Sequence, residues 1–220
     1  MNRPQLDTST TATGPTVSAE AAVEGNSRLT SITGIVLLLL FAAEGVTLLD
    51  VRGLITVHIV LGALLVGPVA LKVASTGYRF VRYYTGAPAY VRKGPPHPIL
   101  RVLGPLVIIT SLAVIGTGIA LGTAPDSGNW GFLHRASFVV WLVVMTVHVL
   151  GHLLEVFRHG SADLRRRSAG LAVRGRPGRF ALVVLALLVG VGTAAVVLPA
   201  SSAWTHGESR YVGGEDHQDR

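Results

Sequence analysis

The chain has 220 residues, of which 50% are hydrophobic and 14% are charged. This composition is typical of a membrane protein and not of a soluble globular domain. Cysteine is absent, which excludes disulfides, thiolate metal sites, iron–sulfur clusters and thioether-linked haem. The formal net charge is +7, but the basic residues adjoin apolar segments, so we interpret them as loops at a membrane surface and expect no nucleic-acid partner.

Five apolar segments follow a polar leader. Residues 1–28 are rich in Thr, Ala, Ser and Gly, and we expect them to be a disordered tail without a cleavable signal. Each apolar segment is long enough to cross a bilayer as a helix of about 20 residues. The segments are 29–49, 53–74, 102–123, 133–156 and 180–199.

The expected fold class is therefore an all-α, polytopic membrane helical bundle. We expect a four-helix core over 29–157, a basic linker over 158–179, a fifth transmembrane helix over 180–199 and a polar tail over 200–220. Arginine is concentrated in the links between segments two and three and between segments four and five. The positive-inside rule then predicts a plasma-membrane protein with a cytoplasmic N-terminus and an extracytoplasmic C-terminus.

Histidines within the apolar segments are the main functional signal. His134, His148 and His152 share one segment, and His58 lies in another. At about 100° per residue, the first three lie along one stripe of a helix. An ionisable side chain inside a membrane span is costly and usually functional. Because imidazole is the usual axial ligand of b-type haem, we expect haem b as cofactor and these four histidines as candidate iron ligands.

Their depths suggest an outer pair. Segments two and four run in the same direction, and both His58 and His134 lie near the start of their segments. We therefore expect the two imidazoles at similar depth near the outer face, where they can bind one haem from both sides. Gly62, one turn from His58, would leave room for the flat macrocycle. Gly116 and Gly118 could do the same, or could serve ordinary helix packing.

A second, inner haem is a further hypothesis. His148 and His152 lie about 21 and 27 Å deeper than His134 at about 1.5 Å per residue. The position fourteen residues after His58 is Lys72, so His97 is the remaining candidate partner. The alternative is that one of these histidines only hydrogen-bonds a propionate, a quinone or a helix terminus.

Several other charged residues lie in or beside the apolar segments. Glu44 could hydrogen-bond a ligand histidine or carry protons at a quinol site, or it could simply reach water. We expect Lys72 to extend toward the inner headgroups. Arg79 and Arg82 lie in a stretch of aromatic and basic residues, 78–84. They could bind haem propionates or a quinone head group, or they could anchor the chain at the interface.

The pattern of His58-Ile-Val-Leu-Gly62, His134 and His148-Val-Leu-Gly-His152 resembles the four-helix transmembrane di-haem cytochrome b superfamily. That superfamily includes the b-type subunits of respiratory hydrogenases and formate dehydrogenases, and it is similar in logic to ferric-reductase-like domains. The resemblance covers residues 29–157, and the spacing of His134 and His148 is similar to that of paired haem ligands on one helix. Lys72 is a departure, because a second histidine is missing from segment two. The stretch 75–86 also resembles actinobacterial membrane proteins.

We therefore expect a b-type cytochrome. It would pass electrons between the quinone pool, or a cytoplasmic donor, and a protein redox partner. We expect a subunit of an oxidoreductase system rather than a stand-alone enzyme, because the sequence shows no hydrolase triad, phosphate loop or nucleotide fingerprint. The alternatives are a histidine-lined metal-ion transporter and a non-catalytic membrane anchor subunit.

Overall fold

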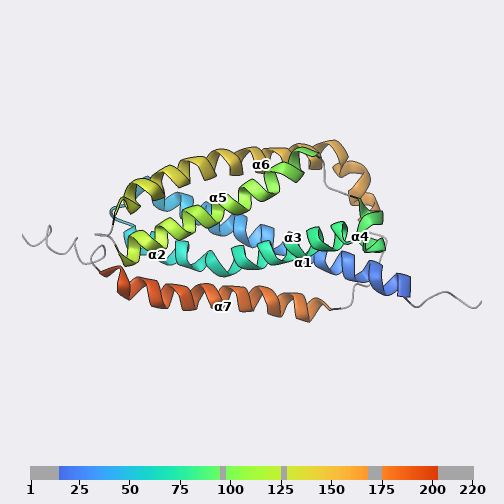
Figure 1. The fold of residues 1–220 in the computed structure, drawn as a ribbon, viewed down its shortest axis with the longest axis horizontal. Coiled ribbons are helices and arrows are strands. Elements are labelled where there is room, and N and C mark those ends of the chain that lie inside the picture. The colour runs from blue at the N-terminus through green and yellow to red at the C-terminus, as the bar shows by residue number, and fades with distance from the viewer. Residues whose placement is uncertain (1–14, 95–97, 125–127, 168–174, 203–220) are drawn as a thin grey trace, which may run out of the picture.

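A computed structural model describes the backbone of residues 15–94, 98–124, 128–167 and 175–202, and the side chains of 19–94, 101–124, 128–152 and 175–202. All regular structure in these residues is helical (Figure 1). The helices are α1 (Pro15–Thr47), α2 (Ile55–Leu64), α3 (Val66–Tyr84), α4 (Pro88–Lys93), α5 (Pro98–Thr123), α6 (Trp130–Arg167) and α7 (Arg176–Ala200), with a short 3-10 helix at Leu48–Asp50.

Five stretches are long and apolar enough to cross a membrane. They are Ala19–Asp50, Ile55–Tyr84, Arg101–Thr123, Trp130–His152 and Arg176–Ala200. Large apolar side chains point away from the protein, with Leu49 87% exposed and Val196 73% exposed. Such an apolar exterior suits a lipid environment. The expected fold class, an all-α multi-pass membrane bundle, is thus confirmed.

The expectation of a disordered tail is wrong for residues 15–28, which belong to α1. Val23 is buried against Ala87 and Tyr90 around α4, and Glu20 forms an ion pair with Arg92 at 3.3 Å. These tertiary contacts hold a polar sequence in a helix that its own composition does not predict. Residues 1–14 lie outside the described residues.

The expected linker also differs in extent. Helix α6 continues to Arg167 and α7 begins at Arg176. The expected linker over 158–179 therefore contains the last turns of one helix and the first turn of the next. Residues 168–174, and residues 203–220 of the expected tail, lie outside the described residues.

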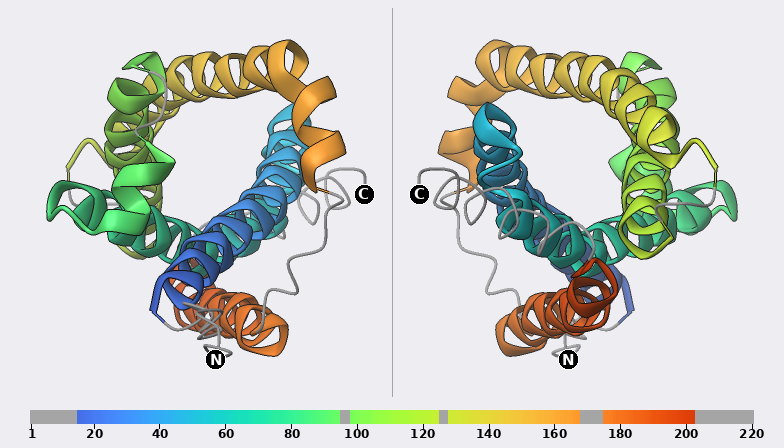
Figure 2. Two further views of the ribbon diagram at one scale, coloured as in Figure 1. Left: turned by 90° about the vertical axis from the view of Figure 1, so that its right-hand side faces the viewer. Right: turned by 90° about the vertical axis from the view of Figure 1, so that its left-hand side faces the viewer.

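The helices form two packed groups. Helix α6 packs chiefly on α5, whereas α7 packs on α2 and α3 and these pack on α1. Seen along the bundle, α6 and α7 lie on opposite sides of the molecule (Figure 2). Helix α5 contacts α2, α3 and α7 and so joins the two groups.

Helix α7 is joined to the second span by a close approach of backbones. Pro68 is fully buried just after the junction of α2 and α3, and having no N–H it leaves the Leu64 carbonyl without its helical donor. Gly190 lies directly against that carbonyl, and Gly67 lies directly against the carbonyl of Ala186. A Cβ atom at either glycine would overlap the facing backbone. The fifth span is therefore an integral part of the bundle.

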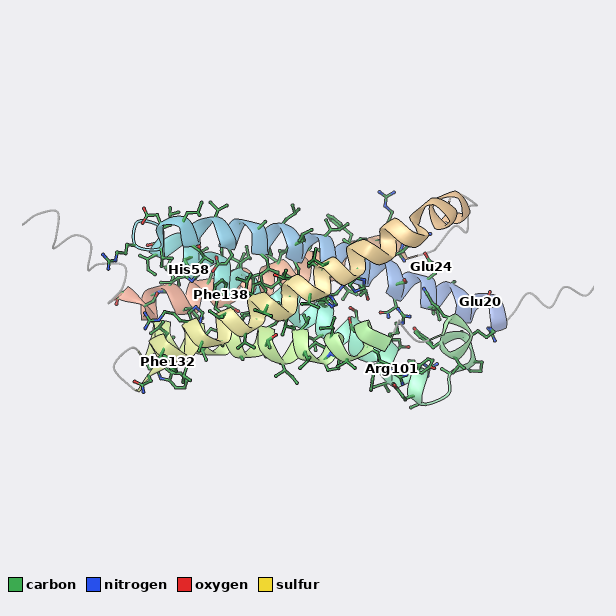
Figure 3. All side chains as sticks on the ribbon, turned by 90° about the horizontal axis from the view of Figure 1, so that it is seen from above. Glu20, Glu24, His58, Arg101, Phe132 and Phe138 are labelled. Carbon is green, nitrogen blue, oxygen red and sulfur yellow. The ribbon has the colours of Figure 1, made fainter. Side chains whose placement is uncertain are left out.

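The two ends of the bundle carry different residues. His58 and Phe132 lie toward one end, and Glu20, Glu24 and Arg101 lie toward the other (Figure 3). We refer to these as the His58 end and the α4 end. Between them lies a small core of Leu37, Leu65 and Val69, with Phe41 packed against it. This core fills the interior of the bundle between the His58 end and the α4 end.

Candidate cofactor site

His58 and His134 come together at the His58 end. His58 lies in the first turns of α2 and His134 in the first turns of α6. Their ring centroids are 6.2 Å apart and their planes are inclined at 75°. Both side chains are half-buried. The two helices start at the same end of the bundle, which is why residues 76 positions apart reach the same depth.

The surroundings of His58 fix which ring nitrogen carries the proton. Its Nδ1 lies 3.0 Å from Oε1 of Glu44 and 2.9 Å from the hydroxyl of Thr47. The Thr47 hydroxyl donates its only hydrogen to the Glu44 carbonyl at 2.6 Å, so toward His58 it can only accept. Both neighbours therefore accept from Nδ1–H, and the lone pair of a neutral His58 is on Nε2.

His134 is held in the same tautomer by different groups. Its Nδ1 lies 3.1 Å from the backbone carbonyl of Val114, which can only accept a hydrogen bond. The hydroxyl of Thr117 lies 3.3 Å from the same nitrogen. Gly118 allows this position, since a Cβ atom there would be 3.0 Å from Cε1 of the His134 ring. The lone pair of a neutral His134 is again on Nε2.

This arrangement is the one that metal-bound histidines adopt. A ligating imidazole binds through one nitrogen and donates the other N–H to a carboxylate or a backbone carbonyl. The structure brings the two rings to a centroid separation of 6.2 Å, each with its Nδ1 beside an acceptor. His58 and His134 are thus the residues that would hold a haem iron, if one binds here.

Glu44 supplies a further sign of an incomplete site. Its side chain is only 16% exposed, and within the described residues its buried Oε2 atom has no hydrogen-bond partner. A buried oxygen of this kind is a place where a water or a ligand could bind. Gly62 lies beside this carboxylate, and a Cβ atom there would be in ordinary contact with it, 3.5 Å from Oε1. Gly116, by contrast, faces open space.

His148 and His152 form a second, separate pair on α6. Their ring centroids are 4.6 Å apart, and because both side chains leave the same face of one helix, they cannot bind one haem from its two sides. The buried Nδ1 of His148 has no hydrogen-bond partner in the described residues. A second haem would therefore need a ligand from elsewhere, and the candidate His97 lies outside the described residues.

Aromatic residues separate the two histidine pairs. Trp141 lies seven residues from both His134 and His148. It is buried, its indole N–H donates to the Ser111 hydroxyl at 3.0 Å, and its ring lies 4.8 Å from that of Phe41. The interior between the pairs is thus filled by an α1–α6 aromatic contact.

The basic residues of the second span do not approach the outer pair. Arg79 and Arg82 lie near the end of α3, about 32 and 36 Å along the span from His58 at about 1.5 Å per residue. The guanidinium of Arg82 lies over the Tyr90 ring, 5.9 Å from its centroid. Burial, and then the neighbouring Tyr78, raise the pKa of Tyr90, while the two arginines oppose the shift. Any clamp formed by these arginines serves the α4 end.

Lys72 is placed differently from expectation. Its ammonium donates to the carbonyl of Thr30 at 2.8 Å, and Gly34 provides the space for it. It therefore links α3 to α1 inside the bundle instead of extending into the headgroup layer.

Several supporting residues were not predicted from the sequence. Thr47 and Thr117 and the carbonyl of Val114 orient the two rings. Threonine is common in transmembrane helices, so the sole signal was the position of Thr47 one turn after Glu44. A backbone carbonyl gives no sequence signal. No group of three or more His, Cys, Asp or Glu side chains that could hold a metal ion occurs in the part of the chain that the structure describes.

Comparisons of the chain with protein-family models, with curated proteins and with solved structures find no significant match.

Proposed function

We propose that this chain is a b-type cytochrome of the membrane, which binds one haem between α2 and α6 through His58 and His134. The observation that carries the proposal is the pair of imidazoles 6.2 Å apart, each with its Nδ1 next to an acceptor. A histidine that binds a metal almost always donates its second ring N–H to a carboxylate or a carbonyl, and both rings of this pair are placed to do so.

The residues of the chain have distinct parts in this proposal. His58 and His134 each offer Nε2, and a bound haem would supply one-electron chemistry at its iron. The carboxylate of Glu44 draws the Nδ1 proton of His58 toward itself, which makes that imidazole a stronger donor. The carbonyl of Val114 does the same more weakly for His134. Phe41 and Trp141 fill the bundle on the interior side of the site.

The direction of electron transfer involves partners outside the chain. We propose that the α4 end, with its arginines, faces the cytoplasm and that the His58 end faces the opposite side, as the positive-inside rule predicts. A membrane quinone or a redox protein would then exchange electrons at either end. At the His58 end, Oε2 of Glu44 is a suitable acceptor for a proton released by a quinol. A second haem at His148 or His152 is compatible with this scheme, but electron transfer in the scheme does not require it.

The test is haem content and spectrum after purification from haem-replete cells. We expect non-covalent haem b near one equivalent, with a low-spin spectrum. His58→Ala and His134→Ala should each lose low-spin character and lower the haem-to-protein ratio. His148→Ala is the matched control, since it lies on the same helix as His134 at about 20 Å from it, and it should keep this centre. Colourless wild-type protein would refute the proposal, and colourless protein that retains stoichiometric zinc or copper would favour a metal carrier instead.

The role of Glu44 gives a second readout. Glu44→Gln keeps the shape of the side chain but removes its charge, so His58 becomes a weaker donor and the oxidised iron is less stabilised. The midpoint potential should rise while haem occupancy is retained. An unchanged potential would show that the Glu44–His58 contact does not act on the iron.

A further inference from the structure

Aromatic and basic side chains gather around Tyr90 at the α4 end of the bundle, away from the outer histidine pair. The Tyr90 ring meets the Tyr78 ring edge to face, with centroids 6.0 Å apart. The guanidinium of Arg82 lies 5.9 Å from the centroid of the same Tyr90 ring. Arg79 precedes Arg82 by three residues, so the two leave neighbouring positions on one side of α3, and both cations act on the Tyr90 phenol. Helices α3 and α4 thus bring two guanidinium groups and two phenols to one place.

The Tyr90 hydroxyl is buried and lacks a hydrogen bond. The residue is only 5% exposed, and its oxygen has no hydrogen-bond partner within the described residues. Burial, and then the neighbouring Tyr78, raise the pKa of Tyr90, but the Tyr78 hydroxyl does not reach it in the geometry of a hydrogen bond. Buried polar atoms in proteins are almost always bonded. This hydroxyl therefore calls for a partner that the described part of the chain does not supply.

The arginines of this cluster have no carboxylate beside them. The described carboxylates at this end have other partners, since Glu20 pairs with Arg92 and Glu24 pairs with Arg28 and Lys93. Within the described ranges, the two arginines of the cluster form no ion pair. Stacking on an aromatic ring attracts a guanidinium but does not neutralise it. Two positive charges therefore remain around one phenol, and they favour an anion.

The cluster lies at the depth of lipid headgroups. The span Ile55–Tyr84 has 30 residues, or about 45 Å at 1.5 Å per residue, whereas the hydrocarbon core of a bilayer is about 30 Å thick. The last turns of α3 therefore reach the headgroup layer. Phe80 and Val81 are each 56% exposed, so apolar surface adjoins the basic residues. A ligand that fits both features carries a negative group and a hydrocarbon chain.

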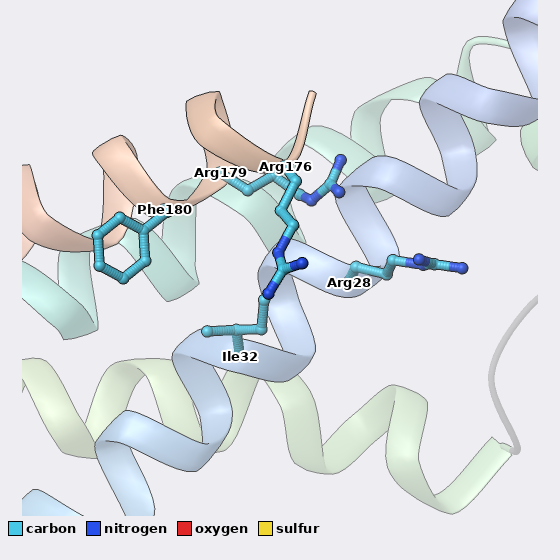
Figure 4. Close-up of a pocket in the computed structure, with 5 residues that line it drawn as sticks. All are labelled: Arg28, Ile32, Arg176, Arg179 and Phe180. Carbon is cyan, nitrogen blue, oxygen red and sulfur yellow. The ribbon is translucent and has the colours of Figure 1, made fainter. Parts of the chain in front are cut away.

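A cavity between α1 and α7 at the same end is built differently. It is lined by Arg28, Ile32, Arg176, Arg179 and Phe180 (Figure 4). Arg28 is already paired with Glu24 at 2.9 Å, and Figure 4 shows its guanidinium turned away from those of the two arginines of α7. These arginines do not converge on one ligand, so they provide a control for general surface charge.

We propose that Arg79, Arg82 and the hydroxyl of Tyr90 bind the headgroup phosphate of an anionic phospholipid in the leaflet at the α4 end. A guanidinium presents a planar set of donors that matches phosphate oxygens, and the phenol would donate to another oxygen of the same group. Basic residues directly beside a transmembrane helix bind anionic lipids in this way. The lipid would join the end of α3 to α4. The proposal is independent of the haem, because its residues belong to neither histidine pair.

The test compares lipid retention by the purified full chain. Native mass spectrometry in mild detergent would follow added phosphatidylglycerol against phosphatidylcholine of the same acyl chains. We expect the wild type to retain one phosphatidylglycerol in preference to phosphatidylcholine, and Arg79→Gln/Arg82→Gln to weaken this binding by about tenfold or more. The matched control is Arg176→Gln/Arg179→Gln, which removes the same charge from the same end and should change retention by less than about twofold.

A second variant tests the hydroxyl without changing the charge. Tyr90→Phe keeps the ring that packs against Val23 and Ala87, so the protein should remain folded. Retention of phosphatidylglycerol should fall by about threefold or more, because one hydrogen bond to the phosphate is lost. Retention equal to that of the wild type would overturn the proposed contact between the hydroxyl and the phosphate.

Three further outcomes would overturn the proposal. Equal losses in the two double variants would show that only the general surface charge matters. Equal retention of the two lipids by the wild type would show that no anionic lipid is selected. Displacement of the lipid by excess inorganic phosphate would show a site for a soluble anion. If the double variant aggregates, Arg82→Gln alone, at an exposed side chain, should weaken retention in a protein that remains folded.

Discussion

Helix α7 packs against the junction of α2 and α3. We therefore predict that a single methyl group added at this contact lowers the stability of the protein substantially. In Gly190→Ala, the new Cβ atom would overlap the backbone of Leu64. A backbone atom cannot rotate away as a side chain can, so α7 must move outward. A gap of about 0.5–1 Å already forfeits a quarter to a half of each dispersion contact. The contacts at risk include the buried face of α7 formed by Val183, Ala186 and Val197. We expect a cost of about 1–3 kcal/mol.

Gly192→Ala is the matched control, because Gly192 lies two residues further along α7 and faces open space. Both substitutions gain the same helix propensity, about 1 kcal/mol in a helix interior, so the difference between the two variants isolates the packing cost. The assay is unfolding in mixed micelles of increasing SDS content, followed by circular dichroism. Stabilities of the two variants that agree within about 0.5 kcal/mol would refute the close-packing argument.

Three further predictions follow from other contacts. Gly118→Ala should displace the His134 ring and lower haem occupancy or low-spin character, whereas Gly116→Ala, facing open space, should do neither; equal spectra for both would contradict this. Trp141→Phe should cost about 1–3 kcal/mol in the same SDS assay, because its buried serine partner on α5 loses its donor. Tyr90 has a pKa raised above 10.0 by burial, so the unfolded chain ionises first. Its contribution to stability is present below pH 10 and lost as pH rises through the folded pKa, and Tyr90→Phe should remove that alkaline step from the pH profile of unfolding.

The main features of the fold were predictable because apolar length is a strong signal. Each expected segment corresponds to one of the five candidate spans, since a bilayer requires about 20 consecutive apolar residues and soluble structure does not. The helical state of residues 15–28 was not predictable, because it depends on contacts of Val23 and Glu20 with α4. The role of α7 was also missed. A glycine in an apolar helix has no signature that distinguishes a close backbone approach, as at Gly190, from open space, as at Gly192.

The histidine pair was predictable in its members and in the contact of Glu44 with His58, but not in its other supports. The direction of the spans predicts that His58 and His134 lie at one depth, and the structure places their ring centroids 6.2 Å apart. Their tautomers depend on Thr47 and on the Val114 carbonyl, which only a three-dimensional arrangement brings to the rings. The proposed clamp of Arg79 and Arg82 was drawn from composition alone, and the length of α3 carries both residues away from the outer pair.

The histidine pair lies where the two groups of helices meet. His58 belongs to the group of α1, α2, α3 and α7, and His134 belongs to the group of α5 and α6. Each ring is oriented within its own group, by Glu44 of α1 in one case and by Val114 of α5 in the other. Besides the contacts that α5 makes, the groups meet through Phe41 and Trp141 and through the two histidines themselves. A cofactor held by both imidazoles would therefore add a link between the two groups, beside the contacts that α5 already makes with α2, α3 and α7.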